Sequence, residues 1–197
     1  MLERIIYEQE TLTVGRIEFC VVGIKPLLTH NPESMGASSG AKRGSRVPEA
    51  EDEAEAGVYR LADGSCGIKG EAFRAAIVKA AAAWKSKRSS MKSQLTHITT
   101  IEELVMLRHP IDGKPLTNYV IDSRRAIVQR QGILRRRPRF DEWMTNFTIE
   151  YDMQLVKEPK IIVNICADAG NRIGVGDYRP DRNGNLGRFK IKDYLLL

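Results

Sequence analysis

The stretch from Gly170 to Ile191 reads GNRIGVGDYRPDRNGNLGRFKI, and its middle alternates glycines with arginines. An apolar, helix-like segment precedes this loop, and a short alternating strand follows it. Glycine lets the backbone adopt conformations that other residues avoid, and arginine donates paired hydrogen bonds to phosphate. Two interpretations fit: the loop contacts a nucleic-acid backbone, or it is a plain connector with solvated arginines. The residues assigned to a phosphate-binding surface are Gly174, Gly176, Arg179, Arg182 and Arg188, with Lys190 on the following strand.

Outward from this loop, the spacing of apolar residues predicts the elements of one domain over residues 1–197. Strands are expected over 14–24, near 103–108, over 143–156 and around 189–191. Helices are expected over 73–84 and 159–169, with Gly170 as the C-cap of the second helix. The order strand, helix, strand, strand, helix, strand is typical of an α+β fold of the ferredoxin-like or RNA-recognition-motif type. In that fold two helices cover one face of an antiparallel sheet.

Two segments stand apart from this pattern. Residues 27–56 are poor in apolar side chains and are predicted to form a flexible insertion, whose acidic run over 49–55 either holds a divalent metal or is a solvated face. Residues 119–140 form an arginine-rich arm, either extended or a hairpin. Its arginines either bind nucleic acid or pair with the acidic run, and the first interpretation is favoured because they outnumber the nearby acids. They are Arg124, Arg125, Arg130, Arg135, Arg136, Arg137 and Arg139.

Further candidates lie elsewhere in the chain. Lys69 and Arg74 flank the start of the first predicted helix and join the proposed interface. Aromatic residues next to basic groups either stack on bases or pack in the core, and for Trp143 the core is favoured. The other three are Tyr119, Phe140 and Tyr178. Replacing Arg179 and Arg188 together by alanine is expected to weaken binding to any nucleic-acid sequence.

Composition sets broad limits. The 197 residues are 42% hydrophobic and carry a net charge of +6 with a pI near 9.3, which suits a polyanionic partner. Three scattered cysteines indicate a reducing compartment, and no run approaches the roughly 18 apolar residues of a membrane span. A cytoplasmic protein that contacts no membrane is expected. The histidines, His30, His97 and His109, are far apart, so no metal or cofactor is predicted.

Two motifs carry a resemblance. The segment GIKGEAFRAA over 67–76, with Lys69, Gly70 and Arg74, resembles the helix entry of the RAMP superfamily, the backbone subunits of CRISPR effector complexes. The segment over 174–191 resembles their glycine-rich loop. The chain is also similar to a group of small uncharacterised phage-encoded proteins, over 124–143 and 169–189. The resemblance implies a modified RNA-recognition fold in which residues 27–56 act as a thumb, and subunits that stack along a single strand.

Three functions follow as hypotheses. The first is a non-catalytic protein that binds RNA or single-stranded DNA and oligomerises along it. The second is a metal-dependent ribonuclease, because some RAMP subunits cleave RNA with an aspartate in the region where Asp52 lies here. The third is a phage interaction protein that interferes with the assembly of a CRISPR complex.

Overall fold

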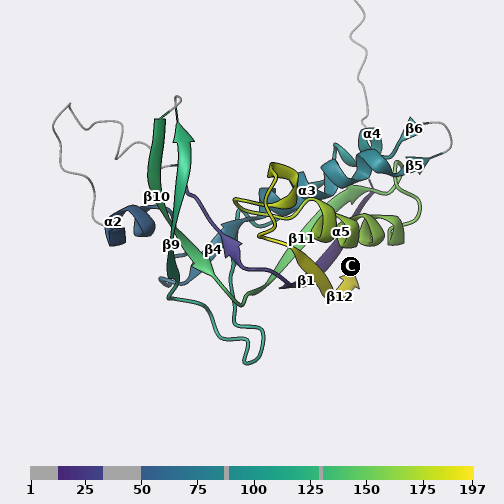
Figure 1. Cartoon of the computed structure of the whole chain (residues 1–197). Helices are drawn as coiled ribbons and strands as arrows, with labels where there is room; N and C mark the ends of the chain where they lie inside the picture. Colours follow the sequence, from purple (N-terminus) through teal and green to yellow (C-terminus); the bar gives the residue numbers. More distant parts are fainter. Residues whose placement is uncertain (1–12, 33–49, 87–88, 129–130) are drawn as a thin grey trace, which may run out of the picture.

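The computed structural model describes residues 13–32, 50–86, 89–128 and 131–197 (Figure 1). It is an α+β structure with antiparallel sheets. The elements, in chain order, are β1 (Val14–Gly23), β2 (Leu27–Leu28), α2 (Ala50–Ala56), β3 (Tyr59–Arg60), β4 (Cys66–Lys69), α3 (Gly70–Ala80), η1 (Ala81–Ala83), β5 (Lys85–Ser86), β6 (Ser89–Ser90), α4 (Lys92–Leu95), β7 (Thr99–Thr100), β8 (Leu104–Met106), β9 (Val120–Val128), β10 (Gln131–Phe140), β11 (Met144–Asp152), α5 (Lys160–Arg172), η2 (Pro180–Arg182) and β12 (Phe189–Leu196).

The main sheet has four antiparallel strands in the order β12-β1-β11-β7. Strand β1 lies in the middle because alternate residues along it are apolar: Ile17, Phe19 and Val21 are fully buried. Opposite them on β11, Ile149 pairs with Ile17 and Phe147 with Phe19, so apolar side chains of both strands share one face. The strand predicted over 14–24 is therefore confirmed.

Helices α3 and α5 pack against each other and against this apolar face. Phe73 of α3 stacks on Phe147 with ring centroids 4.3 Å apart, and its edge meets Phe189 of β12 at 5.5 Å. Helix α5 approaches β12 so closely that a Cβ at Gly170 would lie 2.3 Å from the Phe189 carbonyl oxygen. The core thus lies between one face of the sheet and the two helices.

A long hairpin, β9 and β10, extends from the body beside α2 (Figure 1). For residues 119–140 the sequence was compatible with either an extended arm or a hairpin. In the structure this segment forms a hairpin. Leu28 and Leu27 of β2 pair with Arg139 and Phe140 at the base of β10. The described parts of the 27–56 insertion therefore lie against the hairpin, and residues 33–49 lie outside the described part of the chain.

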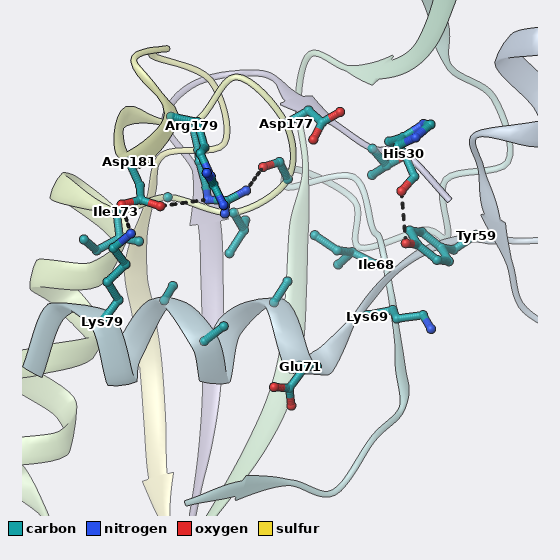
Figure 2. A pocket seen from close by; sticks show the side chains of 18 residues that line it. His30, Tyr59, Ile68, Lys69, Glu71, Lys79, Ile173, Asp177, Arg179 and Asp181 are labelled. Carbon is teal, nitrogen blue, oxygen red and sulfur yellow. Dashed lines mark hydrogen bonds and ion pairs between the residues drawn. The ribbon is translucent and has the colours of Figure 1, made fainter. Parts of the chain in front are cut away.

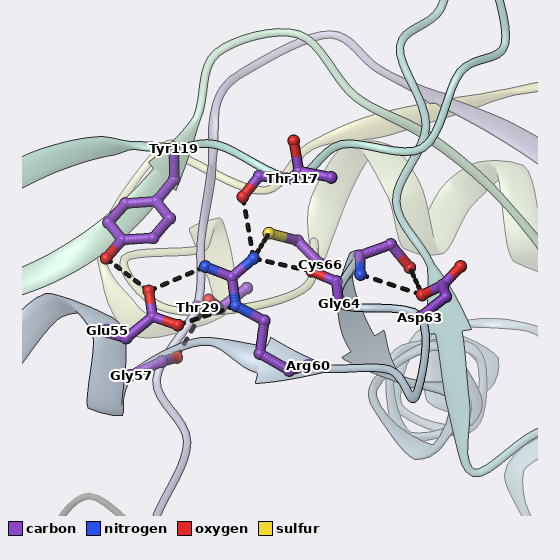
Figure 3. Close-up of polar contacts among 10 residues, drawn as sticks. Thr29, Glu55, Gly57, Arg60, Asp63, Gly64, Cys66, Thr117 and Tyr119 are labelled. Carbon is purple, nitrogen blue, oxygen red and sulfur yellow. Dashed lines mark hydrogen bonds and ion pairs between the residues drawn. The ribbon is translucent and has the colours of Figure 1, made fainter.

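Arg60 ties the base of the hairpin to the body (Figure 3). Its guanidinium donates two hydrogen bonds of 2.8 Å to the Glu55 carboxylate at the end of α2. It also donates to the carbonyl oxygens of Gly64 and Thr117. Tyr119 donates to the same Glu55 carboxylate at 2.8 Å. Because one planar cation joins three chain segments, the hairpin has a fixed attachment.

The second predicted strand, near 103–108, needs a correction. Strand β8 does form there, but it pairs with β4 in a separate three-stranded sheet with β3. The strand that completes the main sheet is β7. Beyond β7, the Glu102 carboxylate accepts hydrogen bonds from the Thr148 amide and hydroxyl of β11, both at 2.8 Å. After β8 the chain contacts β11 again, where Arg108 pairs with Met144.

Two further predictions were wrong at element ends. Helix α5 continues through Gly170 and has Ile173 as its C-cap, so Gly170 is a packing glycine. Gly174, with φ of 71°, takes the left-handed position that follows the helix. Strand β11 ends at Asp152, and the side chains of Met153 and Leu155 are exposed although their alternation predicted burial.

Candidate nucleic-acid interface

The glycine-rich loop folds on itself between α5 and β12. Gly187 has φ of 64°, and a Cβ there would lie 1.7 Å from the Val175 carbonyl oxygen. The amides of Val175, Asp177 and Gly187 donate to the carbonyl oxygens of Gly187, Leu28 and Pro26. These amides are therefore occupied within the fold. A glycine is required at position 187 because the loop packs on itself there. The sequence interpretation differed, since it assumed that the loop glycines let a phosphate approach the backbone.

Replacing Gly187 by alanine is expected to lower the free energy of unfolding by about 3 kcal/mol or more, because the strained φ and the contact with the Val175 carbonyl add together. Gly113 provides the control, since its φ is 69° but a Cβ there would meet nothing within 4 Å. Gly113→Ala should cost only about 1 kcal/mol. Urea unfolding of both variants measures the difference, and equal losses would contradict the packing role of Gly187.

The loop touches the hairpin at two points. Arg124 of β9 lies over the Tyr178 ring, with its guanidinium carbon 4.9 Å from the ring centroid, and the Tyr178 hydroxyl donates to the Arg125 carbonyl at 3.4 Å. Arg137 of β10 forms an ion pair with Asp177 at 3.1 Å. Two regions that the sequence treats separately thereby form one surface.

A cavity of about 500 Å³ lies between the loop and α3 (Figure 2). Five of the predicted site residues line it: Lys69, Gly174, Gly176, Arg179 and Arg182. Arg179 lies within the loop, where it donates to the Gly176 carbonyl at 2.7 Å and pairs with Asp181 at 3.6 Å. Lys69 and Arg182 are exposed and form no ion pair with another described residue.

Several hairpin arginines are paired with acids. Glu53 of α2 forms ion pairs with Arg135 at 3.4 Å and Arg136 at 3.5 Å. Asp122, only 6% exposed, accepts hydrogen bonds from Arg124 and Arg139. Burial alone would raise the pKa of this carboxyl, but the hydrogen bonds from the two arginines hold its pKa below the usual range. The alternative in which arm arginines pair with the acidic run is therefore realised for Arg135 and Arg136.

Other predicted site residues lie away from this surface. Arg74 donates hydrogen bonds to the carbonyl oxygens of Thr96 and Ile98 and so stabilises the loop between α4 and β7. Arg188 donates to Asn171 at the end of α5. Arg130 lies outside the described residues, and Arg125 is exposed without an ion pair to any described residue.

Arg188, Lys190 and Lys192 alternate with apolar residues in the sequence, which predicts a basic stripe on one face of the last strand, but the structure interrupts this stripe. Strand β12 pairs with β1 through an irregularity that skips Lys192 and brings Asp193 opposite Cys20. Glu18, two residues before Cys20, lies on the same face of β1. Lys190 is exposed on β12, but acids share its strand face.

The aromatic candidates divide between core and surface. Trp143 is fully buried, as favoured, and its indole donates to the Lys25 carbonyl at 3.0 Å. Phe140 is 3% exposed, so it is a core residue and unavailable to a base. Tyr119 is half-buried, and burial together with its hydrogen bond to Glu55 raises its pKa to about 12. Tyr178 belongs to the glycine-rich loop itself and is half-buried beneath Arg124.

The fold brings to the cavity seven charged or polar residues that the sequence did not assign to the site: Thr29, His30, Tyr59, Glu71, Lys79, Asp177 and Asp181. Lys79 forms an ion pair with Asp181, which also faces Arg179. Lys79 follows Ala75 and Ala76 on α3, so helical spacing could have suggested its position. From its place after the first strand, His30 could contact phosphate or serve as a general base, but a capping or packing role is favoured for a lone histidine. In the structure it follows β2, which pairs with the hairpin, and lines the cavity.

Asp52, the residue of the ribonuclease hypothesis, is exposed on α2. Within the residues that the structure describes, no group of three or more His, Cys, Asp or Glu side chains is arranged to hold a metal ion. No helix in the described ranges is both long enough and apolar enough to cross a membrane. No protein-family model and no curated protein matches the chain.

Proposed function

We propose that this protein binds single-stranded nucleic acid, RNA or single-stranded DNA, without catalysing a reaction. The observation that carries the proposal is that the glycine-rich loop lines one cavity together with the start of α3 and contacts the arginine hairpin through Asp177 and Tyr178. Lys69, Arg125 and Arg182 are exposed cations of these segments, and none of them forms an ion pair with a described acid. Exposed cations beside a loop and an aromatic ring suit a flexible polyanion whose bases are accessible.

The arrangement of the main sheet supports a ferredoxin-like fold of the RNA-recognition-motif type. If β1, β7, β11 and β12 are its four strands, with α3 and α5 as its two helices, the spatial order reads 4-1-3-2. Both helices pack on the apolar face of this sheet. The hairpin β9–β10 is then an insertion between the second and third strands, and it is the element that extends as a thumb would. This agrees with RAMP-like architecture, although the resemblance implied a thumb at residues 27–56.

Oligomerisation along the strand is part of the proposal. Strand β12 is an edge of the main sheet, and its end exposes Tyr194, Leu195 and Leu196. An edge strand with unpaired backbone groups and apolar side chains can pair with another chain. A sedimentation measurement with and without a single-stranded oligonucleotide tests this, and a monomer under both conditions would contradict it.

The number of free cations leads to a quantitative expectation. Three unpaired cations on the described surface give a slope of log affinity against log salt near −2, at about −0.7 for each phosphate contact. If all thirteen cations assigned from the sequence bound phosphate, the slope would be near −9 by the same rule. Fluorescence anisotropy with labelled uridine and deoxythymidine oligomers, at several salt concentrations, measures it. Absence of binding at low salt by the folded protein would overturn the proposed function.

The exposed edge of β12 also favours a second function, in which the protein binds another protein and interferes with assembly of a CRISPR complex. A partner strand could extend the main sheet at this edge without any nucleic acid. Capture of a CRISPR backbone subunit that survives nuclease treatment would favour this function. Loss of the captured subunit on nuclease treatment would favour nucleic-acid binding instead.

A further inference from the structure

The cavity between α3 and the glycine-rich loop has an apolar wall and a charged mouth. Ala72, Ala75 and Ala76 follow one another at helical spacing on α3, and their short side chains leave the cavity open along the helix. Ile68 and Val175 add apolar surface from β4 and from the loop. At about 500 Å³, the cavity falls within the range of roughly 300–1,000 Å³ that is usual for small-molecule sites.

Polar groups occupy two sides of the cavity. Figure 2 shows Lys79, Arg179 and Asp181 on one side, and His30, Tyr59 and Lys69 on the other. Burial and the nearby Arg137 lower the pKa of His30, so its imidazole is neutral near pH 7 and can both donate and accept a hydrogen bond. The Tyr59 hydroxyl donates to the His30 carbonyl at 3.1 Å, which fixes the backbone that carries the ring.

The charged side chains that line the cavity are four cations and three acids, so its net charge is slightly positive: Lys69, Lys79, Arg179 and Arg182 against Glu71, Asp177 and Asp181. Asp181 is shared by Lys79 and Arg179, so these two cations are already partly neutralised. Lys69 and Arg182 are exposed and form no ion pair with a described residue. Lys79 chiefly lowers the pKa of the Asp181 carboxyl, although Arg182 lies near enough to help lower it. A small inorganic anion would satisfy the cations but would leave the apolar wall uncovered. A nucleotide carries both an apolar planar base with hydrogen-bonding edges and a phosphate, so it matches both parts of the cavity.

We propose that this cavity receives one base of the bound strand, turned out of the stack, while Lys69 and Arg182 hold the neighbouring phosphates. The inference rests on the proposed function and deepens it. The protein would then recognise the base of a nucleotide as well as the negative charge of the strand. The base lies along the alanines of α3. Its polar edge faces His30 and Asp177.

The test compares an intact single strand with a strand of the same length whose sugar–phosphate backbone carries no bases. Wild-type protein is expected to bind the intact strand about tenfold more tightly, in the range measured for base stacking. Ala75→Phe fills the cavity from an exposed helix position and should abolish this preference without changing affinity for the base-free strand. Ala82→Phe, at an exposed position on η1 away from the cavity, should behave as wild type.

The outcomes separate the two proposals. Equal binding of both strands by the wild-type protein would overturn the base site and leave the proposed function intact. The same holds if Ala75→Phe, folded by circular dichroism, keeps the full preference. Failure of wild-type protein to bind either strand at low salt would overturn the proposed function and the base site with it. Because the wild-type comparison needs no variant, the result does not depend on whether Ala75→Phe folds.

Discussion

Reversing the charges of Arg125 and Arg182 together is expected to weaken binding of single-stranded nucleic acid by at least about 25-fold at roughly 0.1 M salt. Both side chains are exposed, Arg125 on β9 of the hairpin and Arg182 in the loop, and neither forms an ion pair with a described acid. Each lost phosphate contact forfeits about 0.7 powers of ten at that salt concentration. The slope of log affinity against log salt should fall in magnitude by about 1.4.

The matched control is Lys92→Glu with Lys157→Glu. Both lysines are exposed, form no ion pair with a described residue and lie outside the cavity, and the change in net charge is the same. This control should change affinity only slightly, because screening weakens the effect of distant charges. Anisotropy titrations of both variants decide the question. An equal loss in the control would mean that net charge alone drives binding, and an unchanged Arg125/Arg182 variant would exclude this surface.

The choice of these arginines corrects the expectation for Arg179 and Arg188. Both of those side chains already serve the fold: Arg179 donates to the Gly176 carbonyl, and Arg188 donates to Asn171. Alanine at either position would therefore disturb the loop as well as remove a charge. A weaker complex in that double variant could not distinguish a lost phosphate contact from a distorted loop.

Phe73→Ala is expected to lower the free energy of unfolding by about 3–5 kcal/mol. The ring is fully buried and joins α3 to both β11 and β12 through Phe147 and Phe189. Its removal leaves a cavity where helix and sheet meet, and the close-packed neighbours cannot collapse into it fully. Urea unfolding followed by circular dichroism measures the loss.

Phe73→Leu is the control for this prediction. Leucine retains most of the apolar volume but lacks the ring that stacks on Phe147 at 4.3 Å. It should cost less than about 1.5 kcal/mol. A loss below about 1 kcal/mol for Phe73→Ala would contradict the role of this side chain as the centre of the core.

Local patterns were sufficient for the long strands and helices of the core, but they missed shorter elements such as α2 and β7. Ile17, Phe19 and Val21 alternate in β1, and Phe73 and Ile77 repeat along α3, because each set must face the same core. The patterns could not identify the partner of each strand. A strand near 103–108 is expected in the main sheet, but β8 pairs with β4 instead, while the neighbouring Glu102 carboxylate bonds to Thr148 of β11. Gly170 is a second example. Its sequence context predicts a helix C-cap, but it lies inside α5 and allows close contact with Phe189, which is distant in sequence.

The candidate site divides in the same way. The sequence by itself determined the glycine-rich loop, the arginine-rich segment and an excess of positive charge, because composition and spacing are local properties. Only the tertiary structure decided which cations are available to a ligand. Arg136 and Glu53 are 83 positions apart in the chain, yet they form an ion pair because α2 packs on β10. An arginine held by a carboxylate must break that interaction before it can bind phosphate, so the availability of each cation depends on contacts that folding alone creates.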